Sequence, residues 1–483
     1  MLKTIEQLIT TLNSKDIAYC HWKSNYVLEQ ALDGYDDLDL LVRKKHALKF
    51  ETTIFDLGFK RVLPMGSSAH PAVEHFFGYD EASGKLVHLH IYYQILTGEG
   101  LLKNYHLPFE DIILNNTIRE QGIPIPSRRL ELEMAVMRSL LKFGSLYEQF
   151  LFSKEKKNIQ KEIQFLLTCQ ETTEVSSILL QEFSGFSIVF FNRCVRCLEK
   201  GSLIKWFFLG KKMRRLLKNC RRYSFFTEHY LKGYEFIKRV VARIGPRKRK
   251  VFAHGGLVIA ITGSDATGKS TVSSHINEWL KKAFTVRLIH AGKPPAGLLN
   301  FIPTLLLPFI RRFFNRARTS VSCKLRDENV TGSLLKAVRL LLLARDRKRL
   351  VTRAFQRAID GTITISDRYP SHTHGAMDSP RIGSSPKWLK GFILEKMASR
   401  EKSIYESIPK ADLLIQLTID VEVAVQRNRD RIKAGNETED YIRIRHKENS
   451  NLEYPYHHRC VVSTNGELDS ILAEVRTIAW QHL

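Results

Sequence analysis

A short glycine-rich segment in the second half of the chain has the clearest chemistry. Residues 258–271 read VIAITGSDATGKST, where an apolar run precedes two glycines spaced five apart, then a lysine and two hydroxyl residues. Glycines let backbone N–H groups turn inward as an anion nest, the lysine can reach the outer phosphates, and the serine hydroxyl can bind Mg²⁺. The spacing predicts a phosphate loop for ATP between a buried strand and a helix. Its expected ATP-binding residues are Gly263, Ser264, Asp265, Ala266, Thr267, Gly268, Lys269, Ser270 and Thr271.

A second acidic position follows an apolar run further along the chain. Residues 361–370 read GTITISDRYP, so TITIS is expected to be a sheet strand with Asp367 at its carboxyl end. Ligands bind at this edge of open α/β sheets. Asp367 can hold the water shell of a Mg²⁺ ion bound through Ser270, and Arg368 can form a forked contact with a second phosphate. The alternative is a strand end with an incidental salt bridge.

Three arginines follow the next apolar strand. Residues 412–431 read DLLIQLTIDVEVAVQRNRDR, and a helix there places Arg427 and Arg431 one turn apart on one face, with Arg429 nearby. Arginines in this position can close over phosphates and neutralise the charge that develops during transfer. We therefore predict these three arginines as catalytic residues. A solvated basic helix is the rival interpretation.

These segments, in this order, resemble the thymidylate kinase family of nucleoside monophosphate kinases over roughly residues 254–483. The resemblance implies an ATP- and Mg²⁺-dependent phosphotransferase that acts on a phosphate-bearing acceptor. Because the phosphate loop of the family has an acidic residue at the position of Asp265, it implies a catalytic role for Asp265 beside Lys269. It also implies that Asp367 lies on the metal side, and that VEVAVQRNRDR followed by ETEDYIRIR forms the lid and the acidic helix behind it.

The acceptor side of the resemblance is less complete. Arg368 corresponds to the family's acceptor-phosphate arginine, and LLLARDRKRL falls where the family keeps another, so Arg345 or Arg347 would serve. The family's Arg-Glu-Pro motif appears as HAGKPP, with Lys293 in place of the arginine. The segment SHTHGAMDSPRIG (residues 371–383) replaces the Tyr-Gln-Gly segment that reads thymine. Thymidylate is the acceptor implied by the family, and a phosphorylated sugar or glycan end is the alternative.

A separate pair of carboxylates lies near the N-terminus. HWKSN is followed by GYDDLDLLV, and a strand there projects Asp37 and Asp39 to one side, as a pair able to bind a divalent metal. The arrangement resembles the nucleotidyltransferase superfamily over roughly the first 100 residues. A Lys-Ser pair replaces the superfamily's Gly-Ser turn, and His88 and His90 stand where a third acid is expected. Nucleotidyl transfer, a binding role of a degenerate site, and an exposed turn with an edge strand remain open.

Composition divides the chain into three regions. Residues 1–126 alternate helix-like and strand-like runs, residues 127–250 read as helices that close with IGPRKRK, and residues 251–483 alternate strands and helices. We expect an α/β protein with a C-terminal P-loop kinase fold on a parallel sheet. An α+β nucleotidyltransferase-like domain and a basic helical connector precede it.

Positive charge is concentrated in the helical region. Residues 201–250 contain 16 Lys and Arg against two Asp and Glu, whereas residues 1–126 contain 12 against 16, in a chain of net charge +25. Trp206, Phe207 and Phe208 adjoin the cations, which favours contact with an anionic membrane surface. Nucleic acid is less favoured because no recognised module accompanies the charge. A solvated or inter-domain face is the third alternative.

Chain length and cysteine content indicate a large globular protein. The chain has 483 residues, 43% of them hydrophobic, and no uninterrupted apolar run reaches membrane-spanning length. Seven cysteines without an export signal indicate free thiols in a reducing cytoplasm, and a peripheral position at the inner face of the membrane is the further expectation. Cys194 and Cys197 form a lone CxxC pair, which we interpret as two buried helix positions in preference to a zinc or redox site. The oligomeric state stays open.

Two classes of function are consistent with these motifs. The first is an ATP- and Mg²⁺-dependent kinase, and the second is a nucleotide-binding regulator with the acidic N-terminal region as its sensor. Asp265, Lys269, Asp367 and the arginines near residue 427 are all present. Because a regulator does not need this complete set, the sequence favours the enzyme.

Overall fold

The computed structural model consists of two compact units, residues 1–250 and residues 251–483. None of the helices that the structure describes combines the length and the apolar character needed to cross a lipid bilayer. The structure describes residues 1–64, 70, 72–143, 153–169, 186–200, 203–244, 249–295, 334–383, 388–429, 438–448 and 452–483.

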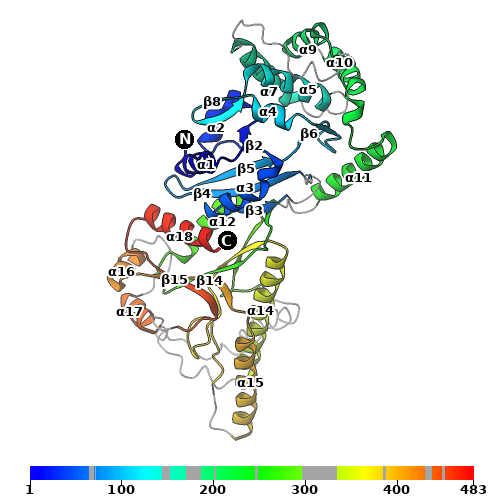
Figure 1. The fold of residues 1–483 in the computed structure, drawn as a ribbon. Coiled ribbons are helices and arrows are strands. Elements are labelled where there is room, and N and C mark those ends of the chain that lie inside the picture. The colour runs from blue at the N-terminus through cyan, green and yellow to red at the C-terminus, as the bar shows by residue number, and fades with distance from the viewer. Residues whose placement is uncertain are drawn as a thin grey trace. The chain divides into compact units, whose positions relative to one another are not determined.

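Five strands of the first unit form a mixed sheet in the order β1-β2-β5-β4-β3 (Figure 1). β2 and β5 are parallel, and the other neighbours are antiparallel. Because successive side chains alternate between the two faces of a strand, Leu40 and Leu89 point into an apolar core shared with α1, α2 and α3, whereas Asp39 and His90 lie on the opposite face. The elements are β1 (Tyr19–His21), β2 (Leu38–Val42), β3 (Lys60–Leu63), β4 (Val73–Asp80), β5 (Lys85–Tyr92), α1 (Lys3–Ser14), α2 (Leu28–Leu32), α3 (Ala47–Asp56), η1 (Asn25–Val27) and η2 (Lys44–His46).

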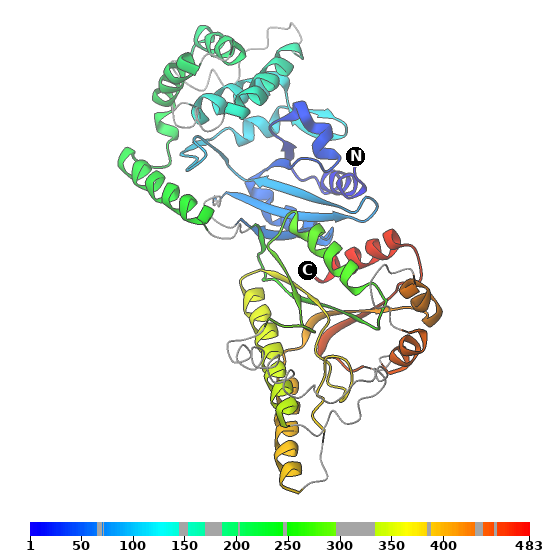
Figure 2. The same ribbon diagram turned by 180° about the vertical axis from the view of Figure 1, so that it is seen from behind.

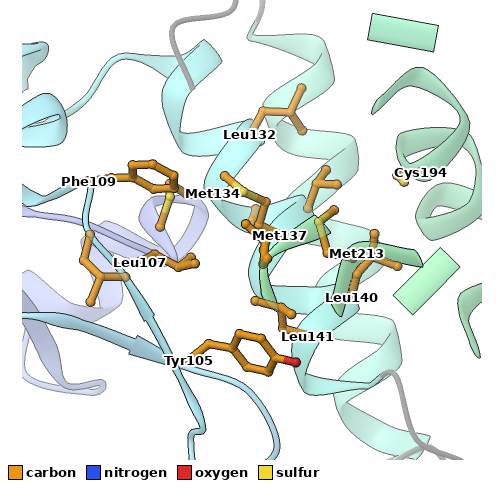
Figure 3. Packing of buried hydrophobic residues seen from close by; sticks show 14 of the residues in the cluster. Tyr105, Leu107, Phe109, Leu132, Met134, Met137, Leu140, Leu141, Cys194 and Met213 are labelled. Atoms are coloured by element: carbon orange, nitrogen blue, oxygen red, sulfur yellow. The ribbon is translucent and has the colours of Figure 1, made fainter. Parts of the chain in front are cut away.

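A second apolar core of this unit joins the short β6–β7 hairpin to a group of helices. Figure 3 shows Tyr105 and Leu107 of β7 near Met137 of α5 and Met213 of α10, with Cys194 of α9 in the same cluster. Burial raises the pKa of the Cys194 thiol to about 12, so this thiol stays protonated. The remaining elements of the first unit are β6 (Ile95–Thr97), β7 (Tyr105–Leu107), α4 (Glu110–Asn115), β8 (Thr117–Glu120), β9 (Ile123–Pro126), α5 (Arg128–Lys142), α7 (Ser153–Thr168), α9 (Ile188–Lys200), α10 (Leu203–Leu216), η3 (Lys218–Cys220) and α11 (Phe225–Ile244).

Two expectations for the helical region differ from this packing. Helices α5, α7, α9 and α10 share their core with the β6–β7 hairpin, and residues 127–250 are part of the first compact unit, so no unit boundary falls at residue 126. Trp206 also lies in the core, where its Nε1 donates to the carbonyl of Cys197 at 2.9 Å. The aromatic surface patch therefore does not include Trp206, although Phe208 is exposed.

Five parallel strands form the sheet of the second unit, in the order β12-β13-β11-β14-β15. The run from Val258 to Ile261 in the central strand is fully buried, as is typical of a parallel sheet covered on both faces. Because β12, β13 and β11 are parallel neighbours in this order, their carboxyl ends lie next to one another. The strands are β10 (Val251–Phe252), β11 (Val258–Gly263), β12 (Val286–His290), β13 (Ile363–Asp367), β14 (Ala411–Thr418) and β15 (Tyr456–Ser463).

Helices cover both faces of this sheet. On one face, Val258 and Ala260 of β11 share a core with Ala344 and Val351 of α14. Ile259 points to the other face, where α12 contacts β11 to β13 and α18 contacts β14 and β15 (Figure 1). The expected α/β architecture with a parallel sheet is confirmed. The helices are α12 (Lys269–Lys281), α14 (Leu334–Ile359), α15 (Trp388–Glu406), α16 (Val421–Arg429), α17 (Glu439–Glu448) and α18 (Leu468–His482).

Candidate active site

The segment between β11 and α12 adopts the backbone conformation that its glycines permit. Gly263 has a φ of +148° and Gly268 a φ of +82°, values that residues with a side chain rarely adopt. A Cβ atom at Gly263 would also lie 2.5 Å from the carbonyl oxygen of Leu417, so a larger residue does not fit there. Helix α12 begins at Lys269, and its N-terminus, the positive end of the helix dipole, faces the loop. The segment therefore has the geometry of an anion-binding nest.

Two oxygen ligands meet beside this loop. The Oγ of Ser270 donates to the Oδ2 of Asp367 at 2.8 Å. Asp367 ends β13, where it pairs in register with Ile261 of β11. The Oδ1 of Asp367 is buried and has no hydrogen-bond partner within the described residues. A buried carboxylate oxygen without a partner is costly, and carboxylate and hydroxyl oxygens suit Mg²⁺. Ser270 and Asp367 therefore fit a Mg²⁺ ion.

The lysine of the loop bonds to the loop's own backbone. Lys269 is 7% exposed, and its Nζ donates to the carbonyl of Ser264 at 2.5 Å. The hydroxyl of Thr267 donates to the same carbonyl at 2.9 Å, which holds the turn together. A lysine in this position can transfer its contact from the carbonyl to a nucleotide phosphate, because the charged donor gains more from an anionic partner.

Helix α17 packs against the phosphate loop and contributes residues that the sequence did not single out. The Nη2 of Arg445 lies 3.4 Å from the Oδ2 of Asp265. The ring of buried His446 bonds the carbonyl of Asp265 at 2.9 Å and the Oγ of Ser264 at 3.2 Å. The sequence ETEDYIRIR indicated a helix here, but its spacing alone does not tell which arginine faces the loop.

The structure separates the acceptor candidates. Arg347 of α14 is buried, and it donates from Nε to the carbonyl of Ala291 at 3.2 Å and from Nη1 to the hydroxyl of Tyr405 at 2.5 Å. Arg345 is exposed and lines a different hollow, between α14 and α15. Lys293 follows β12 and is also exposed. Of these three cations, Arg347 is therefore the one held beside the ends of β12 and β13.

An acidic residue that sequence reasoning missed joins two arginines at this edge. The Oδ1 of Asp378 accepts from the Nη2 of Arg347 at 2.6 Å, and its Oδ2 lies 3.6 Å from the Nη1 of Arg368. Arg368 also lies 3.9 Å from Asp265 and has a φ of +72°, which is rare for a residue with a side chain. Burial and Asp378 raise the pKa of the nearby Tyr454 phenol. Two guanidinium groups thus converge next to the phosphate loop.

The arginines predicted after β14 are engaged elsewhere. The Nη2 of Arg427 donates to the carbonyl of Thr464 at 2.6 Å, and the Nε of Arg429 donates to Glu439 at 2.7 Å. Arg431 lies outside the described residues. The structure brings α16 close to the loop through an apolar cluster with Ala266, whereas Arg427 and Arg429 bond to Thr464 and Glu439. Their catalytic role stays a prediction.

In the first unit, the two predicted carboxylates face one row of histidines. Asp37 lies 2.5 Å from the Nδ1 of His88, and Asp39 lies 3.0 Å from both the Nδ1 of His90 and the Nζ of Lys23. Although burial alone would raise it, the pKa of Asp39 is held below its usual range by Lys23 and His90. Within the described residues, no group of three or more His, Cys, Asp or Glu side chains could hold a metal ion. A metal at Asp37 and Asp39 stays a prediction.

Substitution of this carboxylate pair tests whether the two units act separately. We expect Asp37→Asn combined with Asp39→Asn to leave the ATP turnover predicted for residues 251–483 largely unchanged, because both residues belong to the other compact unit. The measurement is ADP release by the full chain, with circular dichroism to verify folding. Loss of turnover in a folded variant would show that the two units share one site.

Comparisons with known proteins give matches among solved structures. No protein family model matches this sequence, and neither does any curated protein. A thymidylate kinase from Ehrlichia chaffeensis is 18% identical, and the match covers 47% of this chain and 99% of that one with a TM-score of 0.24. A thymidylate kinase from Candida albicans is 21% identical, and the match covers 47% of this chain and 90% of that one with a TM-score of 0.27. These values describe at most a likeness of fold over about half of the chain.

Proposed function

We propose that residues 251–483 transfer a phosphoryl group from ATP to a phosphate-bearing acceptor in a Mg²⁺-dependent reaction. The observation that carries this proposal is the contact of Ser270 with Asp367 beside a glycine loop in anion-nest conformation. A loop that only stabilised the fold would not need a buried carboxylate with one oxygen that lacks a hydrogen-bond partner among the described residues.

Each part of the site has a distinct task in this reaction. The N–H groups of the loop and the Nζ of Lys269 hold the donor phosphates, and Ser270 and Asp367 hold the metal. When bound, Mg²⁺ supplies positive charge against the phosphate oxygens. Arg368 and Arg347 orient the acceptor phosphate close to the donor, which is the main requirement of phosphoryl transfer. Because a phosphate acceptor is already anionic, the reaction needs no general base.

The acceptor end of the site has a polar character. The segment of residues 371–383 places Asp378 between the two arginines, and the phenol of Tyr454 lies near the same carboxylate. Carboxylate and phenol groups bind hydroxyl groups well. Thymidylate is the acceptor that the family resemblance implies, and a sugar phosphate or glycan end is the second candidate, favoured by this arrangement.

An acceptor screen distinguishes these candidates. Purified full chain with ATP and Mg²⁺ is assayed for ADP release against nucleoside monophosphates and against sugar phosphates. We expect one acceptor class to stimulate release well above the rate with ATP alone. Efficient and base-selective use of thymidylate would exclude the sugar candidate, and a lack of stimulation by every phosphorylated acceptor would argue against the proposal.

Arg368 at the acceptor end and Arg345 away from it provide a matched pair of variants. Arg368→Ala should raise the Michaelis constant of the acceptor by about tenfold or more, because a charge-assisted contact is worth about 1.5–3 kcal/mol. The Michaelis constant of ATP should stay the same. Arg345→Ala is the control, since Arg345 is exposed and lines another hollow. An equal effect of Arg368→Ala on both substrates, or an effect of the control, would contradict this assignment.

A further inference from the structure

Helix α11 of the first unit binds the rest of that unit through its polar side. Glu228 is buried and accepts from Asn104 at 2.6 Å. Lys232 forms ion pairs with Glu99 at 2.7 Å and with Glu228 at 2.6 Å. Arg239 donates to a main-chain carbonyl of the β6–β7 connection at 2.7 Å. These residues recur at helical spacing along one side, so the attachment of α11 is made by hydrogen bonds and ion pairs.

The opposite side of α11 is apolar and exposed. Phe226 is 84% exposed, Tyr230 73%, Tyr234 56%, Ile237 63% and Val241 62%. Their spacing of three or four residues makes one continuous stripe over four turns. We call these five residues the outer face of α11. An amphipathic helix of a globular protein ordinarily turns its apolar stripe toward the core. Here the orientation is reversed, and both views show α11 at the margin of its unit (Figure 1, Figure 2).

The exposed charges of α10 and α11 have one sign. Glu228 and Glu235 are the two acidic residues of positions 201–250, against 16 Lys and Arg. Glu228 is buried and pairs with Lys232, and Glu235 is 17% exposed and pairs with Lys238. Lys238 also lies 6.0 Å from the ring of Tyr234 on the outer face. Helix α10, which precedes α11 in the chain, has exposed Phe208 together with exposed lysines and arginines. Among the described residues of these two helices, the exposed charged side chains are therefore cations.

We propose that the outer face of α11 docks on a lipid bilayer that contains anionic phospholipids. Ile237 and Val241 can enter the boundary between headgroups and acyl chains, and Tyr230 and Tyr234 suit the headgroup level. Lys238 beside Tyr234, together with the exposed cations of α10, attracts anionic headgroups. This is contact along the surface of one leaflet, in agreement with the lack of a membrane-spanning helix among the described residues. The proposal does not depend on the phosphotransfer reaction.

Two other occupants agree less well with the charges and the stripe. Nucleic acid binds chiefly through phosphate contacts, but the outer face is a stripe of aliphatic and aromatic side chains, although Lys238 lies 6.0 Å from the Tyr234 ring. A second copy of the chain would bring two strongly basic surfaces together, and like charges across an interface oppose association. A bilayer with anionic lipids suits both the apolar stripe and the exposed cations of α10 and α11.

Vesicle sedimentation of the full chain tests the proposal. The probes are vesicles of phosphatidylcholine alone and of phosphatidylcholine mixed with phosphatidylglycerol. We expect binding to the mixed vesicles, and we expect Ile237→Glu with Val241→Glu to lower the partition coefficient by about tenfold or more. The control is Leu48→Glu on α3, which changes an exposed apolar residue of the same unit and should leave binding intact. Melting curves verify that each variant is folded.

Several outcomes would overturn the docking assignment. These are a wild-type chain that stays in the supernatant with mixed vesicles, equal binding to both vesicle types, or binding that the paired glutamates do not reduce. Light scattering without lipid tests whether a second copy of the chain binds the outer face. A dimer that Ile237→Glu dissociates would assign the outer face to self-association. Binding of duplex nucleic acid that the same substitution abolishes, without vesicle binding, would assign it to nucleic acid.

Discussion

ATP with Mg²⁺ should raise the unfolding temperature of residues 251–483, and Lys269→Ala should abolish this shift. A ligand at 100 times its dissociation constant adds about 2.7 kcal/mol to the stability of the folded state. Lys269 lies over the loop, bonded to a carbonyl of the loop itself, so its loss removes the main charged contact to the donor phosphates. The measurement is differential scanning calorimetry of the full chain with and without ATP.

A lysine from the other end of the same helix serves as the control for this experiment. Lys281 lies in the last turn of α12 and is largely exposed, so Lys281→Ala should keep the full ATP-dependent shift. If ATP does not stabilise the wild-type chain, the assignment of a nucleotide phosphate loop is wrong.

The second large effect concerns the metal. Asp367→Asn keeps the shape of the side chain but removes its charge, next to the hydroxyl of Ser270. Loss of a residue that supports a bound metal typically costs 10–100-fold in affinity or activity, so we expect turnover to fall by about 10–100-fold. Raised Mg²⁺ concentration should restore part of the loss, because the variant binds the ion more weakly. ADP release measured against Mg²⁺ concentration gives both quantities.

The exposed Asp360, seven residues earlier, provides the matched substitution for this second experiment. Asp360→Asn changes the same chemical group at the turn after α14 and should have no effect on turnover. Full activity of Asp367→Asn at every Mg²⁺ concentration would exclude Asp367 from the metal site.

The parts of the site that the sequence predicted are those that depend on the spacing of residues close together in the chain. The phosphate loop follows from the spacing of Gly263, Gly268 and Lys269, and Asp367 follows from its position at the end of an apolar strand. Both depend on residues that are close in sequence, with tertiary packing needed only to bring the two strands side by side. The same holds for the parallel sheet, whose buried strands are continuous apolar runs.

The residues at the acceptor end could not be identified from the sequence in the same way. Arg345 and Arg347 stand two residues apart on a helix, and only the direction of the core decides between them. The sequence did contain an indication in favour of Arg347. This residue falls on the stripe of buried Ala344, Val351 and Ala354, at spacings of three and four. Asp378 had no comparable signal, since it lies in a segment without regular periodicity and is identified only by its contacts with Arg347 and Arg368.

Helix α11 illustrates a further limit of sequence pattern. Its periodicity predicts an amphipathic helix, but periodicity does not tell whether the apolar stripe faces the core or the solvent. The sequence drew attention to Trp206 as a membrane residue, whereas the structure buries Trp206 and exposes Phe226 and Tyr230. The pairing of Glu228 with Asn104, distant in sequence, sets this orientation.

The most direct test of the phosphotransferase proposal follows the γ-phosphate of ATP. The full chain is incubated with Mg²⁺, ATP labelled in the γ-phosphate and the best acceptor of the screen, and the labelled products are separated. We expect label on the acceptor in an amount equal to the ADP formed, and no label there with Lys269→Ala. Intact ATP with every acceptor, or label released only as inorganic phosphate at a rate independent of the acceptor, would contradict phosphoryl transfer and favour a nucleotide-binding regulator.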